Sequence, residues 1–401
     1  MREIATVGVL GAGTMGAGIA QVAAEAGLDV LLFDPVVGAT DRARDRIAGF
    51  LTRRAEKGQL TAEEASAATA RINQVASLES LAAADLVIEA IPEELELKRD
   101  AFRRLDAASA ADAILATNTS SLSVARIASA AARPERVLGM HFFNPVPLMA
   151  LVEVIAGPLT APEVADSVAL LARRLGKTPV VASDTPGFIV NRVQRALYLE
   201  AYRILEEGLA EVEAIDEAVR DLGFRLGPFE LADVVGTDVN LAAGESIFDG
   251  FYGDPRYRPA QIQRRVADAG RLGRKSSAGY YDYAEDGSRG EPWEALMRRS
   301  GPRPAPLAAE TIQGRVLATI VNEAASALAD GVGSPEAIDT AMRLASNWPD
   351  GPLAWGERIG LGSVVETMEA LHGAVPDGRY RVTPLLRSVA ERGGSFFADR
   401  S

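Results

Sequence analysis

A glycine-rich turn near the N-terminus constrains the fold of this chain more than any other feature. Residues 4–10 are a short apolar run rich in β-branched side chains, and residues 11–16 (Gly-Ala-Gly-Thr-Met-Gly) follow directly. The alanine-rich stretch 17–26 favours a helix, and a second apolar run at 30–33 ends in Asp34. Glycines between a strand and a helix, with an acidic residue a little over twenty positions on, are typical of a dinucleotide-binding βαβ unit.

Each glycine of the turn has an expected task. Gly11 permits the tight turn, Gly13 lets the backbone approach a pyrophosphate, and Gly16 allows the helix to pack closely on the strand. The helix N-terminus offers free N–H groups and a positive dipole end to the phosphates. Asp34 would accept hydrogen bonds from ribose hydroxyls and repel a 2′-phosphate, which favours NAD over NADP as the cofactor. We expect the cofactor to contact Gly11, Gly13, Thr14, Met15, Gly16 and Asp34.

Composition excludes several classes of protein. The 401 residues are too many for one ordinary core, and a net charge of −13 argues against a nucleic-acid partner. With no cysteine and two histidines, we expect no disulfide, thiol nucleophile or metal centre. Neither a signal arrangement nor an apolar run of membrane-spanning length is recognisable, so we expect a cytoplasmic protein without a membrane partner.

A helical hairpin is predicted after the second strand. Residues 40–57 and 61–71 have helical character, with Gly58 between them. Arg53 and Lys57 gather positive charge on this hairpin, although composition alone favours a solvated helix face.

Polar residues follow three later apolar runs, at 85–91, 113–117 and 136–140. Because ligands bind outside the carboxyl ends of the strands in an open parallel sheet, Asn118, Ser120 and His141 are expected to face the same crevice as the glycine turn. Imidazole can take and give a proton near neutral pH, which makes His141 a candidate catalytic base. The alternative is a hydrogen-bonded histidine of the core.

Several further motifs accompany the glycine turn. They are 118–122 (Asn-Thr-Ser-Ser-Leu), 141–145 (His-Phe-Phe-Asn-Pro), 186–192 (Pro-Gly-Phe-Ile-Val-Asn-Arg), 272–275 (Leu-Gly-Arg-Lys) and 279–283 (Gly-Tyr-Tyr-Asp-Tyr). Together these motifs resemble one known family, the NAD-dependent 3-hydroxyacyl-CoA dehydrogenases, along essentially the whole chain. Segment 351–357 (Gly-Pro-Leu-Ala-Trp-Gly-Glu) further resembles a bacterial subgroup of phenylacetate degradation that acts on 3-hydroxyadipyl-CoA.

The resemblance implies roles for residues at matching positions. His141 corresponds to the catalytic base and Glu153 to its paired carboxylate, while Ser120 and Asn191 correspond to residues that hold the substrate. Taken singly, Ser120 could be a helix N-cap, Glu153 a surface carboxylate and Asn191 an early-helix residue. The residues expected around the nicotinamide are Glu93, Lys98, Asn118, Asn144 and Lys275. The basic residues expected to contact the CoA nucleotide are Arg53 and Lys57.

The second half of the sequence repeats itself. Residues 213–216 (Glu-Ala-Ile-Asp) recur at 336–339, and 256–258 (Arg-Tyr-Arg) recur at 379–381. In this alignment Asn191 falls on Gly314, so the second copy is expected to keep the fold and lack the chemistry. We expect it to take the place of a partner subunit, giving an intrachain pseudo-dimer, with homo-oligomers left open.

The expected fold class is an α/β Rossmann-like domain with an inserted helical hairpin, followed by two tandem all-α domains like the C-terminal domain of 6-phosphogluconate dehydrogenase. The domain boundaries expected are 1–184 for the NAD-binding domain, 185–284 for the first helical copy, 285–306 for a Gly-, Pro- and Arg-rich linker, and 307–401 for the second copy.

The expected activity is the reversible oxidation of (S)-3-hydroxyacyl-CoA to 3-ketoacyl-CoA, in fatty-acid or phenylacetate degradation. Candidate substrates are 3-hydroxyadipyl-CoA and 3-hydroxybutyryl-CoA. One alternative is an NAD-dependent hydroxy-acid or polyol dehydrogenase that does not use CoA, and another is a nucleotide-binding sensor without turnover.

Overall fold

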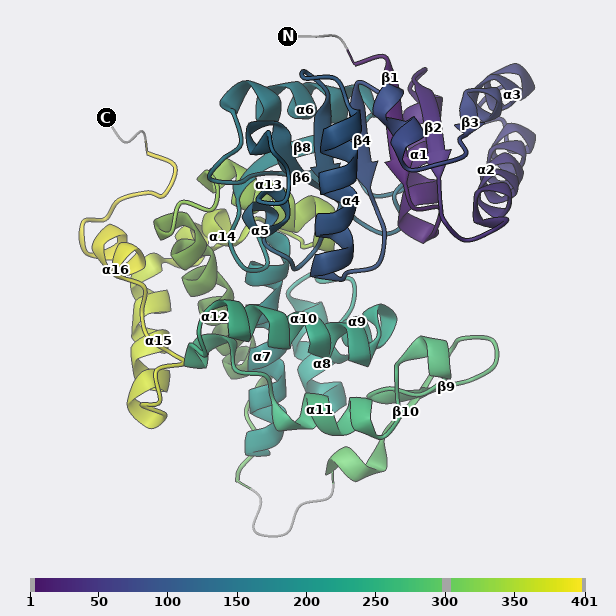
Figure 1. Cartoon of the computed structure of the whole chain (residues 1–401). Coiled ribbons are helices and arrows are strands. Elements are labelled where there is room, and N and C mark those ends of the chain that lie inside the picture. Colours follow the sequence, from purple (N-terminus) through teal and green to yellow (C-terminus); the bar gives the residue numbers. More distant parts are fainter. Residues whose placement is uncertain (1–3, 298–303, 399–401) are drawn as a thin grey trace. The chain divides into compact units, whose positions relative to one another are not determined.

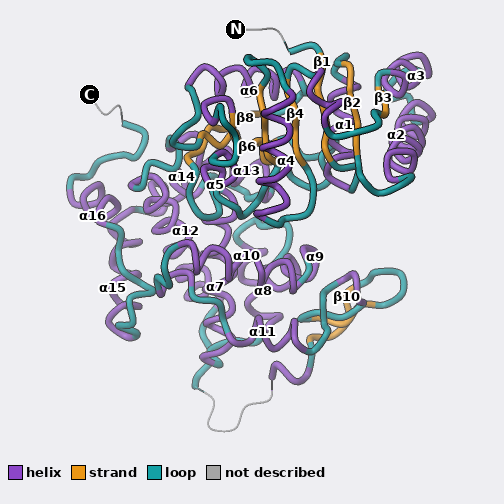
Figure 2. The backbone as a smooth tube through the Cα atoms, viewed as in Figure 1, coloured by secondary structure: helices purple, strands orange, loops and turns teal. Residues whose placement is uncertain are grey.

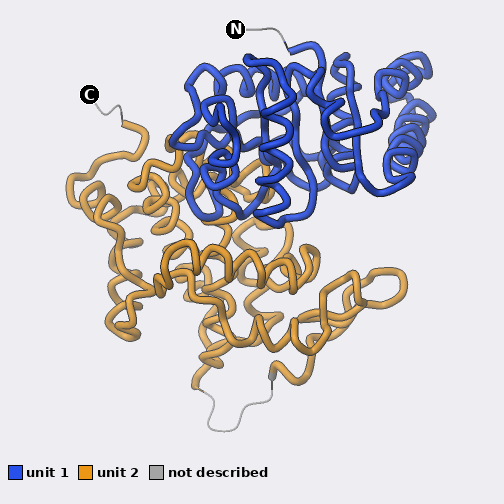
Figure 3. Tube along the Cα trace, in the orientation of Figure 1, with its two compact units in different colours: residues 1–188 blue, residues 189–401 orange. Residues whose placement is uncertain are grey.

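The computed structural model of the protein describes residues 4–297 and 304–398. The chain divides into two compact units, Met1–Phe188 and Ile189–Ser401, which Figure 3 distinguishes by colour. Each unit is described by itself.

The first unit is built on one sheet, seen as orange strands in Figure 2. In its described part the strand order is β3-β2-β1-β4-β5-β6-β7-β8. All neighbours pair in parallel except β6 and β7, which are antiparallel. The strands are β1 (Thr6–Leu10), β2 (Asp29–Phe33), β3 (Ile72–Gln74), β4 (Leu86–Glu89), β5 (Ile114–Thr117), β6 (Val137–Phe142), β7 (Leu151–Ala156) and β8 (Thr178–Ser183).

Helices cover both faces of this sheet, as Figure 1 shows. One buried apolar cluster joins the sheet to α1, α2, α3 and α6, and a second joins it to α4 and α5. Central strands such as β1 and β4 are mostly apolar because both of their faces are covered, and the main exception in β4 is the buried Glu89 at its end. The helices are α1 (Thr14–Glu25), α2 (Ala39–Glu56), α3 (Ala62–Ala70), α4 (Leu95–Ala108), α5 (Val124–Ala128) and α6 (Pro162–Arg174).

The second unit is almost entirely helical (Figure 2). Helices α7 to α11 recur, in the same order, as α12 to α16. Their bounds are α7 (Val190–Glu207), α8 (Val212–Asp221), α9 (Pro228–Val235), α10 (Thr237–Gly250), α11 (Gln261–Asp268), α12 (Ala309–Ala329), α13 (Pro335–Ser346), α14 (Pro352–Ile359), α15 (Leu361–Ala374) and α16 (Pro384–Glu391).

Ion pairs join the two copies reciprocally. On α7, Arg192 donates to Glu323 of α12 at 2.7 Å, and on α12, Arg315 donates to Glu200 of α7 at 2.6 Å. The two arginines and the two glutamates occupy equivalent positions, because the same interval separates both pairs along the sequence. This exchange of equivalent partners is what a two-fold axis produces between identical subunits.

Each of the two helical copies has an aspartate, at equivalent positions, that caps the start of a helix. Asp216 accepts hydrogen bonds from two amides in the first turn of α9, at 2.9 and 3.2 Å. Asp339 does the same at the start of α14, at 2.8 and 3.0 Å. Both carboxyls are buried, and burial raises the pKa of Asp216 to about 7 and that of Asp339 to about 6.

The segment expected to be a linker is partly ordered into an antiparallel hairpin. Strand β10 (Arg289–Pro292) pairs with β9 (Tyr281–Tyr283), and a short 3₁₀ turn follows at Glu294–Met297. The Arg289 guanidinium carbon lies 4.8 Å from the centre of the Tyr281 ring. Glycine-rich composition marks hairpin turns as well as linkers, which is why the two could not be separated from sequence. Residues 298–303 of the expected linker lie outside the described residues.

Candidate active site

His141 and Glu153 form a buried pair in the first unit. They are register partners on the antiparallel strands β6 and β7, so their side chains lie on the same face of the sheet. The His141 Nδ1 atom lies 2.7 Å from Glu153 Oε2, and the two residues are 6% and 0% exposed. Glu153 is therefore not the surface carboxylate that its sequence alone allowed.

Aromatic rings enclose the imidazole. The centre of the Phe143 ring lies 4.5 Å from the centre of the His141 ring, and the centre of the Phe188 ring lies 6.0 Å from it. Phe188 has a φ of +50°, a conformation that costs free energy for a residue with a side chain. The strained Pro-Gly-Phe turn thus brings an apolar ring against the candidate base.

Glu93 holds the segment that carries Ser120. Its Oε1 atom accepts hydrogen bonds from the Thr119 hydroxyl at 2.5 Å, from the Ser120 amide at 3.0 Å and from the Ser121 amide at 3.1 Å. The side chain that caps α5 is Ser123, so Ser120 does not serve as the N-cap of that helix. The Ser120 side chain is half-buried, after the end of β5.

Lys98 lies beneath this segment. Its ammonium contacts Glu89 at 2.6 Å and Glu93 at 3.2 Å, and the side chain is only 1% exposed. Burial raises the pKa of Glu89, whereas Lys98 and the hydrogen bonds from 119–120 lower the pKa of Glu93 against the effect of its burial. The resemblance predicts Lys98 beside the nicotinamide, and in the structure its ammonium is buried and paired with both Glu89 and Glu93.

The three glycines of the N-terminal turn have different surroundings. A Cβ on Gly16 would lie 1.9 Å from the Gly11 oxygen, and one on Gly11 would lie 2.6 Å from the Ala90 oxygen, so packing demands both glycines. A Cβ on Gly13 would meet no atom within 4 Å. The absence of a side chain at Gly13 therefore serves no packing need, which fits the close approach of a ligand phosphate to the N-terminus of α1.

Asp34 ties the end of β2 to this turn. Its two oxygens accept hydrogen bonds from the Ala12 amide at 2.7 Å and from the Val36 amide at 2.8 Å. Arg46 of α2 donates to the Ala12 oxygen at 3.1 Å, a contact for which the sequence gave no signal. The glycine turn, the open space at Gly13 and the acidic residue form a cradle that fits NAD.

Two asparagines flank the histidine. Asn118 Oδ1 accepts a hydrogen bond from the Phe142 amide at 2.8 Å, which joins the end of β5 to β6 beside His141. Asn144 is exposed and precedes a cis peptide bond with Pro145. The structure thus gathers Asn118 and His141 at neighbouring strand ends, as parallel-sheet geometry predicts.

Two of the predicted site residues, Asn191 and Lys275, belong to the second unit. Asn191 is half-buried and is the second residue of α7. Lys275 contacts both carboxylate oxygens of Asp238 at 2.6 Å, with its side chain half exposed. The nearby tyrosine motif is structural, because the buried Asp233 accepts hydrogen bonds from the amides of Tyr280 and Tyr281.

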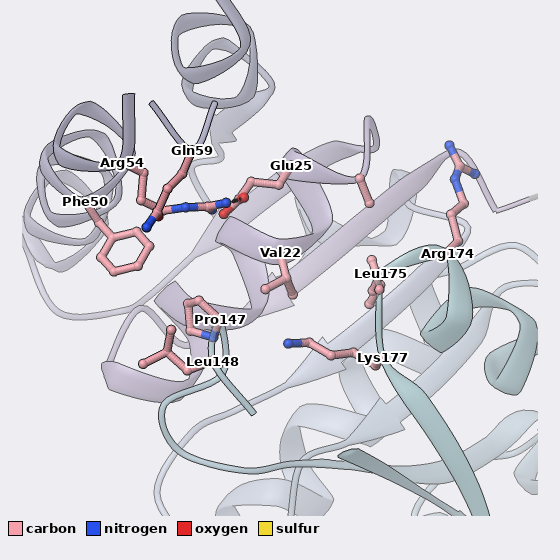
Figure 4. Close-up of a pocket in the computed structure, with 12 residues that line it drawn as sticks. Val22, Glu25, Phe50, Arg54, Gln59, Pro147, Leu148, Arg174, Leu175 and Lys177 are labelled. Atoms are coloured by element: carbon pink, nitrogen blue, oxygen red, sulfur yellow. Dashed lines mark hydrogen bonds and ion pairs between the residues drawn. The ribbon is translucent and has the colours of Figure 1, made fainter. Parts of the chain in front are cut away.

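The basic hairpin residues lie on α2 and at its end. Arg53 and Lys57 are exposed, whereas Arg54 pairs with Glu25 of α1 and lines a cavity of about 450 Å³. Figure 4 shows this cavity, which combines apolar and charged side chains. The residues that line it are Val22, Glu25, Ala26, Phe50, Arg54, Gln59, Pro147, Leu148, Arg174, Leu175, Gly176 and Lys177.

Within residues 4–297 and 304–398, no group of three or more His, Cys, Asp or Glu side chains is arranged to hold a metal ion. In the same ranges, no helix has the length and apolar character needed to cross a bilayer.

Comparison with known proteins identifies the family. The sequence profile described as the NAD-binding domain of 3-hydroxyacyl-CoA dehydrogenase matches residues 6–185, and that of the C-terminal domain matches 187–283 and 312–395. The chain is 40% identical to 3-hydroxyadipyl-CoA dehydrogenase of Escherichia coli (strain K12), across 97% of this chain and 98% of that protein. It is 45% identical to a probable 3-hydroxybutyryl-CoA dehydrogenase of Bacillus subtilis, across 71% of this chain and 99% of that protein.

A solved structure agrees with these matches. The crystal structure of 3-hydroxybutyryl-CoA dehydrogenase from Escherichia coli K12 superposes with a TM-score of 0.88 at 38% identity, covering 98% of this chain and 99% of that one. The predicted resemblance, the Rossmann-like fold with a helical C-terminal part, and NAD as cofactor are confirmed. The chain belongs to the 3-hydroxyacyl-CoA dehydrogenase family.

Proposed function

We propose that this protein oxidises (S)-3-hydroxyacyl-CoA to 3-ketoacyl-CoA with NAD, in a reversible reaction, using His141 as the base. The observation that carries the proposal is the buried His141–Glu153 pair, with 2.7 Å between Nδ1 and Oε2, on a strand of the NAD-binding unit. The family match supports a catalytic pair over a histidine that serves only as a hydrogen-bonded residue of the core.

His141 would accept the proton that leaves the substrate hydroxyl. With Nδ1 donating its hydrogen to Glu153, Nε2 is the nitrogen with a free lone pair. Protonation of Nε2 creates an imidazolium, and the negative charge of Glu153 then stabilises it. Burial of both groups strengthens their interaction because little water screens it.

Ser120 and Asn191 would orient the reacting oxygen. The amides and side chains around Glu93 fix the backbone that carries Ser120, so its hydroxyl is offered from a rigid segment. We assign Asn191 to the same substrate on the family resemblance, and Asn118, Asn144, Glu93 and Lys275 to the nicotinamide side of the cofactor. Bound NAD supplies the hydride acceptor, and the cradle of Gly11, Gly13, Thr14, Met15, Gly16 and Asp34 holds it.

Arg53 and Lys57 would contact the nucleotide part of CoA. Both are exposed cations on an otherwise acidic protein, where they can meet phosphate groups. They favour a CoA thioester over the free hydroxy acids or polyols of the alternative function. The names of the relatives make 3-hydroxyadipyl-CoA and 3-hydroxybutyryl-CoA the acyl groups to compare first. We further propose that the protein works in the cytoplasm.

We infer that the second helical copy acts as a built-in partner for the first. The reciprocal pairs Arg192–Glu323 and Arg315–Glu200 support this, because they repeat one contact in both directions. Gly314 stands where Asn191 stands in the first copy, so one chain would have one active site.

Mixing the protein with NADH and acetoacetyl-CoA, and following the loss of NADH absorbance, tests the function. Turnover with the CoA thioester and none with free acetoacetate is expected. Turnover with free acetoacetate at the same efficiency would favour the alternative dehydrogenase. NADH binding without turnover of any 3-ketoacyl-CoA would favour the sensor. A parallel comparison of 3-hydroxyadipyl-CoA with 3-hydroxybutyryl-CoA, in the oxidation direction, measures the acyl preference.

A further inference from the structure

We propose that Lys177 is a positioning residue that holds the loop between His141 and Glu153, and thereby sets the geometry of the pair. The inference rests on the proposed function for its meaning in catalysis. Lys177 lies outside the sequence motifs, and we assign it no contact with the substrate or the cofactor.

The loop in question spans residues 143–150 and joins β6 to β7. A loop that connects two antiparallel strands fixes their register, and a slip by one residue would turn a side chain to the other face of the sheet. Because His141 and Glu153 are register partners, their contact depends on this connection. Asn144 lies in the same loop.

Lys177 forms hydrogen bonds with the backbone of this loop. Its ammonium donates hydrogen bonds to the Val146 oxygen at 2.6 Å and to the Met149 oxygen at 2.8 Å. Next to it, the Thr178 amide donates to the Ala150 oxygen at 2.7 Å. In Figure 4 the Lys177 side chain points toward Pro147 and Leu148, the residues between the two carbonyls.

The loop also rests on α1. A Cβ on Gly18 would lie 2.8 Å from the Cβ of Val146, so the loop packs directly on the backbone of that helix. Helix α1 begins at the glycine turn. The loop thus contacts both the cofactor-binding helix and the start of β8, where Lys177 supplies two of the three hydrogen bonds described above.

Burial of the charged Lys177 ammonium costs free energy of desolvation. The residue is 8% exposed, and burial lowers the pKa of its ammonium, partly opposed by the Glu25 carboxylate. Arg54 and Arg174 line the same cavity, so further positive charge lies nearby. Loss of this donor would remove a hydrogen bond from the buried Val146 oxygen and one from the part-buried Met149 oxygen, which costs free energy.

The test compares three variants in the full-length protein. Lys177→Met keeps the aliphatic stem and removes the donors, and Lys177→Arg restores a charged donor. Arg174→Met is the matched control, because Arg174 lines the same cavity but donates to the Ile4 oxygen, at 2.8 Å, and not to the loop. For each variant, kcat and KM with acetoacetyl-CoA, the Kd for NADH and the Tm are measured.

We expect Lys177→Met to lower kcat by roughly ten- to a hundredfold, in line with the cost of small misplacements in active sites, with the NADH Kd within about twofold of wild type. Lys177→Arg should recover part of the loss, and Arg174→Met should leave kcat unchanged. Wild-type kcat in Lys177→Met would overturn the inference, as would an equal loss in Arg174→Met. Should Lys177→Met not fold, Lys177→Leu, which also removes the donors, takes its place with the same expectations.

A second readout does not depend on turnover. The protein has two histidines, so ¹⁵N-histidine labelling gives ring signals from His141 and His372 alone. Lys177→Met should shift the signals of His141 and leave those of His372, on α15, in place. Unchanged His141 signals would refute the positioning role even if the wild type reduced no 3-ketoacyl-CoA, whereas that lack of turnover by itself would count only against the proposed function.

Discussion

His141 and Glu153 face each other from opposite strands, with Nδ1 and Oε2 2.7 Å apart and with Glu153 fully buried. The antiparallel turn of β7 against β6 makes this contact, in a sheet whose first six strands are otherwise parallel. A residue twelve positions away in sequence is thereby placed directly beside the imidazole.

Replacement of His141 by alanine should remove the base. We expect kcat to fall by roughly 10²- to 10⁴-fold, the usual contribution of a general base, with NADH still bound. Steady-state assays with acetoacetyl-CoA and NADH fluorescence titrations measure the two quantities. His372→Ala is the control and should retain wild-type kcat. Activity retained by His141→Ala would show that another group takes the proton.

Glu153→Gln should impair the reaction while keeping the fold. An amide at this position carries no charge to stabilise the imidazolium and can donate to Nδ1, which would favour the wrong tautomer of His141. We expect kcat to fall at least about a hundredfold, as in other histidine–carboxylate pairs. Circular dichroism checks the fold. A variant with normal kcat would mean that the Glu153 charge has no part in catalysis.

Asp34→Ser should weaken discrimination between the two nicotinamide cofactors. The aspartate charge repels a 2′-phosphate, and its loss should raise the ratio of NADPH affinity to NADH affinity by roughly tenfold, the effect of about 1.4 kcal/mol. Since Asp34 also accepts hydrogen bonds from Ala12 and Val36, absolute NADH affinity should fall as well. Fluorescence titration with both cofactors gives the ratio, and an unchanged ratio would contradict the assigned role.

Asp216 should make stability depend on pH. Its pKa is raised from 3.8 to about 7 by burial, so between these values the folded state binds more protons than the unfolded state. The free energy of unfolding contributed by this group therefore falls as pH rises from about 4 to about 7. Tm is measured across this range for wild type and for Asp216→Asn. As pH rises, the Tm of the wild type should fall relative to that of Asp216→Asn. A difference that is constant, or that shifts in favour of the wild type, would contradict the prediction.

Truncation after Pro306 should leave α7 without its partner helix. Helix α7 is buried along most of its length and packs on α12, and Arg192 would lose Glu323. The shortened chain should aggregate or associate with itself, because an apolar face and a buried arginine become exposed. Size-exclusion chromatography with light scattering measures the mass. A truncated chain that is monomeric and fully active would show that the second copy is not a partner.

The sequence predicted the parts of the fold that rest on local rules. Gly11 and Gly16 are demanded by contacts to neighbouring backbone, and such contacts are what the glycine pattern encodes. Asn118 and His141 could be placed together because parallel strands end at one edge. The five strands expected in the first unit are present, with ends that differ by up to two residues.

Other parts depend on contacts that no local pattern reveals. The reversal of β7 is a property of the whole sheet, so the burial of Glu153 could not be read from its neighbours in sequence. The resemblance predicted Lys98 beside the nicotinamide, but its burial against Glu89 and Glu93 depends on side chains from separate segments and could not be derived from its neighbours in sequence. The role of Lys177 arises from two backbone oxygens, which carry no sequence signature.

The reciprocal arginine–glutamate pairs of the helical unit bear on how this protein could change over time. In a dimer of identical chains, every substitution occurs twice, and a residue cannot be kept on one side and lost on the other. Here the two sides are encoded separately, so Asn191 stands against Gly314 while Arg192 and Arg315 both remain. Because both halves lie in one chain, each can be selected separately: under the proposed function, the first for the chemistry and the second for the contacts that hold its neighbour.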